Sequence, residues 1–101
     1  MKEIIDLLQK NRVICKKLEE IKLNTKKKIK AFLGVNLKNE YCLIVIFYKK
    51  SRFLNKDVEI LREIEDKLKI NFRYKRKYLI LSGEICSKSK ENLKDWRIFW
   101  F

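Results

Sequence analysis

The stretch Tyr41-Cys42-Leu43-Ile44-Val45-Ile46-Phe47-Tyr48 decides the fold of this chain. Its eight consecutive residues are apolar or half-apolar, and most of them are β-branched or aromatic. A strand with one solvent-facing side would alternate apolar and polar residues, and this stretch does not alternate. The pattern indicates the central strand of a sheet that is covered on both faces, as in parallel or mixed sheets. Eight residues are too few to cross a bilayer, so no membrane span is expected.

The composition indicates one folded domain with a large positive charge. The 101 residues are 47% hydrophobic and 39% charged, which fits a single small domain, 1–101, with one core. Twenty-six Lys and Arg residues oppose thirteen Asp and Glu residues, so the net charge is +13. This charge favours polyanionic partners such as nucleic acid, although a lysine-rich composition by itself explains part of it.

Several kinds of site lack their usual residues. The chain has no histidine, which removes the Ser-His-Asp triad and the commonest zinc ligand. Cys15, Cys42 and Cys86 are widely spaced, so we expect no disulfide framework, no metal and no cofactor. The odd cysteine count and the lack of a signal sequence favour a cytoplasmic setting. Because no catalytic motif is present, we expect a binding protein rather than an enzyme.

The N-terminal region predicts a long amphipathic helix over residues 1–25. Its stripe-forming residues recur at alternating steps of three and four, and they are Ile4, Leu7, Asn11, Ile14, Leu18 and Ile21. In one interpretation this stripe is a self-associating seam, in which Asn11 fixes the register of a homodimer. In the other, the stripe packs on the sheet of the same molecule.

The hydrophobic period changes from helical to strand-like before the central stretch. From Ile29 to Leu37 apolar residues recur at every second position, and a polar turn follows. Residues 28–37 and 41–48 are therefore expected to form a β-hairpin. The alternative is that the first helix continues to Leu33.

The C-terminal half predicts helices and strands in alternation. A helix is expected over 55–69 with Asn55 as its N-cap, and a short helix over 87–95. Strands are expected over 72–81 and 96–101. The predicted fold is α/β, with α+β as the alternative: a small mixed sheet of three to four strands in the order α-β-β-α-β-α-β. A right-handed parallel βαβ unit joins its central strands.

The positive charge is concentrated in three short blocks, at Lys26–Lys30, Lys49–Arg52 and Arg73–Lys77. Around the third block aromatic and basic residues alternate, a pattern typical of strands that stack bases and neutralise phosphates. An edge strand protected by lysines gives the same pattern. We expect binding of nucleic acid, with RNA or single strands ahead of duplex DNA. The residues expected to bind it are Lys26, Lys27, Lys28, Lys30, Lys49, Lys50, Arg52, Arg73, Tyr74, Lys75, Arg76, Lys77 and Tyr78.

The loops that follow two of the strands predict a smaller anion site. Ligands of open α/β sheets favour the carboxyl ends of parallel strands, and helix N-termini there attract anions. The residues that would hold a phosphate are Ser51, Arg52, Ser87, Lys88 and Ser89. Solvated side chains and helix caps explain the same loops without a ligand.

A non-enzymatic interaction module is the alternative function. Such a protein would form a homodimer or dock an acidic partner through its basic blocks. Aromatic side chains at the C-terminus would suit a partner surface, and these are Trp96, Phe99, Trp100 and Phe101.

Overall fold

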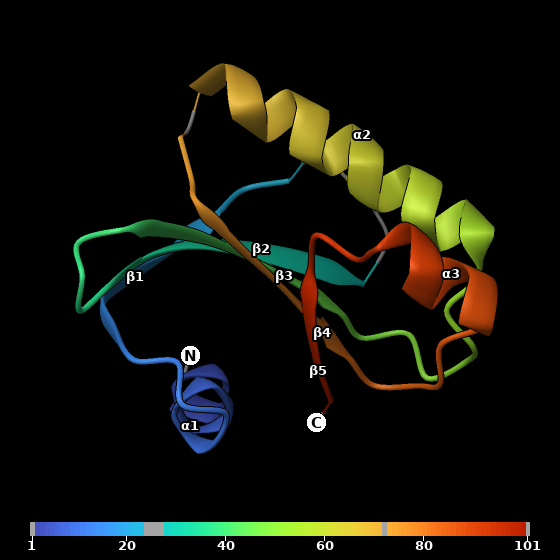
Figure 1. Cartoon of the computed structure of the whole chain (residues 1–101), viewed down its shortest axis with the longest axis horizontal. Coiled ribbons are helices and arrows are strands. Elements are labelled where there is room, and N and C mark those ends of the chain that lie inside the picture. Colours follow the sequence, from blue (N-terminus) through green and yellow to red (C-terminus); the bar gives the residue numbers. More distant parts are fainter. Residues whose placement is uncertain (1, 24–27, 72, 101) are drawn as a thin grey trace.

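The computed structural model describes residues 2–23, 28–71 and 73–100, which form a five-stranded mixed sheet with helices on both faces (Figure 1). β3 (Tyr41–Phe47) is the middle strand. Four consecutive side chains at its centre are 0% exposed, and these are Leu43, Ile44, Val45 and Ile46. The prediction of a central strand covered on both faces is confirmed.

The predicted hairpin is also confirmed. β2 (Ile29–Asn36) pairs antiparallel with β3, so the alternative of a helix reaching Leu33 is wrong. In the turn, the side-chain oxygen of Asn36 accepts the backbone N–H groups of Lys38 and Glu40 at 3.0 and 2.9 Å. Asn39 has a φ of 63°, a conformation that asparagine tolerates better than most residues.

Two helical crossovers follow β3. α2 (Asn55–Asn71) leads to β4 (Arg76–Leu81), and α3 (Ser87–Asn92) leads to β5 (Arg97–Trp100). β4 pairs parallel with β3, and β5 pairs parallel with β4 at the edge of the sheet. Both helices lie over the same face of the sheet (Figure 1). No helix in residues 2–23, 28–71 or 73–100 is long and apolar enough to cross a membrane.

The predicted N-terminal helix over 1–25 is wrong beyond its first third. α1 (Lys2–Lys10) ends in a Schellman motif, in which the N–H of Val13 donates to the carbonyl of Leu8 at 2.7 Å and the N–H of Arg12 to that of Gln9 at 2.9 Å. The side-chain amide of Asn11 donates to the carbonyl of Leu7 at 2.9 Å. Arg12 then adopts a φ of 64°, which a helix cannot continue through. Asn11 therefore lies at the end of the helix and does not set the register of a seam.

The residues after this turn form a strand, β1 (Cys15–Ile21), which pairs antiparallel with β2. A register shift between Cys15 and Lys17 places Cys15 and Leu18 on the α1 side of the sheet, whereas Ile21 packs on the α2 side. The spacing of three therefore comes from a bulged strand rather than from a helix. This additional strand corrects the order to α-β-β-β-α-β-α-β, with five strands rather than three to four.

The corrected N-terminus also removes the helical homodimer seam. Its six residues, Ile4, Leu7, Asn11, Ile14, Leu18 and Ile21, are divided between α1, β1 and the turn that joins them. Ile4 is buried, and together with Leu8 it packs against the sheet of its own chain.

The sheet separates two apolar clusters, one under α2 and α3 and the other over α1. The first contains Leu43 and Val45 with Leu61 and Leu68 of α2. The second contains residues of the opposite parity in the strands, and these are Phe32, Ile44, Ile46 and Ile80, with Ile4 and Leu8 of α1. Alternate side chains of β3 point into each cluster, because successive strand residues point to opposite faces.

We predict that Leu43→Ala and Ile44→Ala each lower the free energy of unfolding by about 2–5 kcal/mol, because each leaves a cavity in a different cluster. Leu37→Ala is the control, since that side chain is 62% exposed. Urea unfolding followed by circular dichroism measures all three. A loss at only one of the two adjacent positions would contradict the burial of β3 on both faces.

Candidate functional site

The described part of the first basic block, residues 28–30, and the second block, Lys49–Arg52, lie at one end of the sheet. β2 begins where β3 ends, and the N–H of Tyr48 donates to the carbonyl of Lys28 at 2.9 Å. The ammonium of Lys30 lies 5.9 Å from the centre of the Tyr48 ring, within the range of a cation–π contact. Lys56 and Lys88 line a shallow pocket where α2 and α3 begin. We call this surface the basic end, and it consists of Lys28, Lys30, Lys49, Lys50, Arg52, Lys56 and Lys88.

The buried carboxylate of Asp57 fixes the loop between β3 and α2. It accepts the backbone N–H of Leu54 at 2.9 Å and the ammonium of Lys49 at 2.8 Å. A carboxylate at the third helical position bonds the preceding backbone in this way in a capping box. Asn55, the predicted N-cap, is instead the first residue of α2. Lys49 is therefore partly neutralised, and its role is to hold the loop.

The other cations of the basic end face solvent. Lys28, Lys30, Lys50, Arg52 and Lys56 are all exposed. The two loops that join strands to helices here, 48–54 and 82–86, contain one carboxylate, that of Glu84, and Asp57 in the first turn of α2 is paired with Lys49. A polyanion at this end would thus meet several exposed cations and little opposing charge.

The loop after β4 lies directly against this basic loop. The N–H of Phe53 donates to the carbonyl of Glu84 at 2.7 Å, and Phe53 and Ile85 form a parallel bridge. A side chain on Gly83 would meet the carbonyl oxygens of Lys50 and Ser51 at 2.6 Å, so only glycine fits this approach. The two loops therefore form one unit.

Trp100 is joined to the same unit at the end of β5. Its indole N–H donates to the carbonyl of Gly83 at 3.1 Å, and 44% of the residue is exposed. The sequence predicts only a partner surface for Trp100, because nothing local in the sequence shows this long-range contact.

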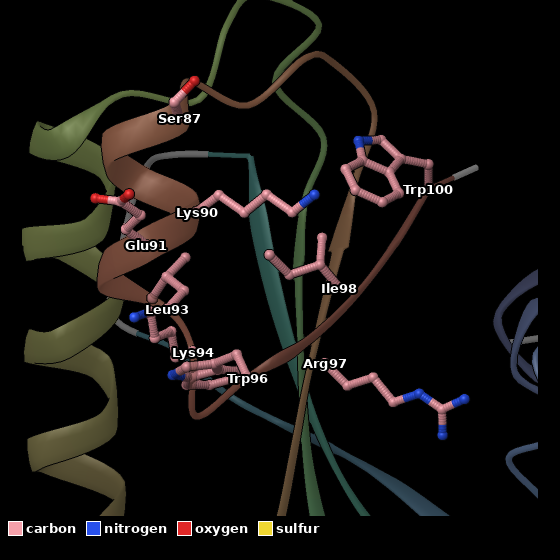
Figure 2. A pocket seen from close by; sticks show the side chains of 9 residues that line it. All are labelled: Ser87, Lys90, Glu91, Leu93, Lys94, Trp96, Arg97, Ile98 and Trp100. Atoms are coloured by element: carbon pink, nitrogen blue, oxygen red, sulfur yellow. The ribbon is translucent and has the colours of Figure 1, made fainter.

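A groove of about 660 Å³ runs between α3 and β5 beside Trp100. Figure 2 shows Lys90 extending from α3 across this groove toward Ile98 and Trp100. Lys94 and Arg97 also line it, with Glu91 as the acidic residue. The exposed ring thus lies next to further positive charge.

The third basic block lies at the opposite end of the sheet. Arg76 pairs with Cys42 near the start of β3, and the N–H of Lys75 donates to the carbonyl of Tyr41 at 2.8 Å. Because a strand rises about 3.3 Å per residue, the length of β3 separates this far end from the basic end by roughly 20 Å. Arg76 lies 3.7 Å from the carboxylate of Glu40, whereas Arg73 and Lys75 are exposed.

The two tyrosines expected to stack bases point inward. Tyr78 is 8% exposed and stacks on Phe99 with 5.7 Å between ring centres. Tyr74 packs against the cluster under α2, and its hydroxyl is buried. Burial raises the pKa of Tyr74 to about 12. Neither ring is presented to a ligand as the sequence predicted.

Lys77 is held by acidic side chains of its own chain. Its ammonium pairs with Asp95 and lies 3.2 Å from the buried carboxylate of Glu65. The guanidinium of Arg62 also pairs with Asp95, at 3.1 Å. Together they hold the pKa of Asp95 well below its usual range, with the hydrogen bond from Arg62 as the largest cause. Lys77 therefore ties β4 to α2 and to the residues before β5.

The expected anion-binding residues are close in the fold but differ in exposure. Ser87 and Lys88 line the shallow pocket at the start of α2 and α3, and Ser51 and Arg52 are exposed in the neighbouring loop. Ser89 is 0% exposed and bonds Cys86 and Asn55 at 2.9 and 3.2 Å.

Lys26 and Lys27 lie outside the described residues. Within residues 2–23, 28–71 and 73–100, no group of three or more His, Cys, Asp or Glu side chains is placed to hold a metal ion.

Comparison with known proteins shows a likeness of fold. No protein-family model matches the sequence, and no curated protein matches it either. The structure is similar to EndoMS in its apo form, with a TM-score of 0.61 and 18% sequence identity. The likeness covers 99% of this chain and 46% of the EndoMS chain, so this chain spans about half the length of that protein.

We predict that Gly83→Ala lowers the free energy of unfolding by about 1–3 kcal/mol, because the added methyl would force the two loops apart. Ser82→Ala is the control, since Ser82 is exposed and adjacent. Thermal unfolding compares the two variants. Equal stability of the Gly83→Ala variant and the unmodified protein would contradict the close contact between the loops.

We predict that Asp95→Asn flattens the loss of stability in acid. Because the folded-state pKa of Asp95 lies below its unfolded value, the carboxylate adds stability above about pH 4, and this stability is lost as the pH falls further. Urea midpoints between about pH 6 and pH 2 measure the effect, with Asp66→Asn as the control. An equally steep acid loss in the Asp95→Asn variant would rule out the ion pairs described above.

Proposed function

We propose that this protein binds single-stranded nucleic acid at the basic end of its sheet. The exposed cations there contact phosphates, and Trp100 stacks a base. The observation that supports this most is the joining of an exposed indole and a cluster of exposed cations into one surface, through the contacts of Gly83.

The chemistry of each component fits such a ligand. Lysine and arginine neutralise phosphates and release the counterions bound to them. An exposed aromatic ring stacks any base, because every base has a π-face. Trp100 is well placed for this, since the hydrogen bond of its indole N–H to Gly83 fixes the ring while much of the residue stays exposed.

The basic end fits a polyanion better than the far end does. At the far end Arg76 pairs with Glu40, and Lys16 bonds the side chain of Asn39. Glu19 adds negative charge on the neighbouring strand β1. Tyr41 is an exposed ring there, so the far end is the natural comparison surface for every binding experiment.

The proposal extends the expectation of nucleic-acid binding but uses a different aromatic residue. Trp100 takes the stacking role that the sequence assigns to Tyr74 and Tyr78. The expectation of RNA or single strands ahead of duplex DNA stays a prediction. EndoMS is similar in fold and lends no support to a particular ligand.

Removing three cations from the basic end should weaken binding at least about 10-fold. The variant is Lys28→Ala/Lys50→Ala/Arg52→Ala, and the control, Lys38→Ala/Arg73→Ala/Lys75→Ala, removes the same charge from the far end. Fluorescence anisotropy of a labelled single-stranded oligonucleotide at fixed salt gives both dissociation constants. We expect less than about a 3-fold change in the control. A larger loss in the control would move the interface to the far end, and equal losses would mean diffuse attraction.

Trp100→Ala should weaken binding of a single strand by about 5- to 100-fold, as expected for one lost base stack, while Trp100→Phe retains most of the affinity. Duplex DNA should bind both variants alike, because its bases are already stacked. Thermal unfolding checks that the variants fold. Unchanged affinity of the Trp100→Ala variant for single strands would remove base stacking from the proposal.

A further inference from the structure

β1 is an edge strand whose outer side has no paired strand among the described residues. Its regular part, from Lys17 to Ile21, leaves backbone donors and acceptors at the edge of the sheet. Proteins commonly protect such edges with charges, bulges or short strands, because an open edge invites a second chain. Here the bulge next to Lys16 limits the open edge to the segment that follows it.

The charges of this strand are arranged symmetrically about Leu18. Lys16 and Lys17 precede it, and Glu19 and Glu20 follow it. If two copies of β1 pair antiparallel about a two-fold axis at Leu18, Lys17 of one copy lies directly opposite Glu19 of the other. Lys16 is the extra residue of the bulge, so it is not part of this register. The attraction between Lys17 and Glu19 occurs twice, because an interface with two-fold symmetry uses the same residues from both copies.

The faces of the strand agree with this register. Residues directly opposite in an antiparallel pair share a face, and their Cβ atoms lie about 4.5–5.5 Å apart. Lys17 and Glu19 are both exposed on the α2 side, where they line one groove of about 470 Å³ with Leu33 and Val35 of β2. Neither makes an ion pair with another described residue, so both are available to a second copy.

Apolar side chains flank the same edge on the α1 side. Ile5 is 40% exposed, and Leu18 is half-buried. Ile5 and Leu18 line a narrow groove between α1 and β1. A second copy at this edge would cover part of this apolar surface, which adds a hydrophobic contribution to the charge pairs.

We propose that two copies of this chain associate by antiparallel pairing of their β1 strands about Leu18. One sheet then runs through both copies. The partner is a second copy because the charge order of the strand is complementary to itself. The residues of the basic end belong to the start of β2, the loop after β3 and the first turns of α2 and α3, so none of them lies in β1.

Charge reversal with a compensating swap tests the pairing. Lys17→Glu places like charges opposite each other twice per dimer, and it should raise the dimer dissociation constant at least about 10-fold. Lys17→Glu/Glu19→Lys restores opposite charges in the same register and should restore the dimer. Lys22→Glu is the control, because it makes the same change in net charge at an exposed residue just beyond β1.

Sedimentation equilibrium of the full chain over about 1–200 µM gives the four dissociation constants. We expect dimers for the unmodified protein, the swap and the control, with loss of dimer in Lys17→Glu alone. A monomer throughout the range would overturn the proposal. A dimer that Lys17→Glu leaves intact, or one that the swap fails to restore, would overturn the β1 register. Oligonucleotide binding by the Lys17→Glu variant shows separately whether the proposed function holds.

Discussion

Burial of β3 on both faces is the constraint on which the rest of this structure depends. Leu43 and Val45 need cover from one side, and Ile44 and Ile46 need it from the other. Neighbouring strands pair only along the sides of β3 and cannot cover its two faces, so helices must pack on both faces. α2 and α3 cover one face, and α1 covers the other. Each crossover returns the chain to the same end of the sheet, because β3, β4 and β5 run parallel.

The distribution of charge follows from this covering. Where both faces of a sheet are packed with apolar side chains, lysines and arginines lie at the strand ends, in the loops and at the outer edges. Part of the positive charge therefore lies at the ends of the strands, and the rest lies on the outer faces of the helices and on the edge strand β1. The hairpin register brings Lys28 and Lys30 to the end of β3, where Lys50 and Arg52 also lie. The parallel register of β5 brings Trp100 level with Leu81 at the same end.

Sequence patterns predicted those parts of the fold in which one period extends over a whole element. The hairpin and the parallel crossover from β3 to β4 belong to this class. Residues 15–21 do not keep one period. A bulge separates Cys15 and Leu18, which share a face, by three residues, and Ile21 then packs on the other face. Within the candidate site, the blocks were visible as lysine runs, but their convergence depends on strand register. The inward placement of Tyr78 and the contact between Trp100 and Gly83 depend on residues distant in the sequence.

Salt dependence of binding tests the central claim most directly. Labelled single-stranded RNA, single-stranded DNA and duplex DNA would each be titrated with the full chain between about 50 and 300 mM salt. We predict sub-micromolar binding of a single strand near physiological salt, ahead of duplex. Its log–log slope should be about −3, as expected when about four of the exposed cations of the basic end contact phosphates at roughly −0.7 each. Weak binding of all three ligands that disappears by moderate salt would contradict a nucleic-acid-binding surface at the basic end. The net charge would then reflect only the lysine-rich composition of the chain.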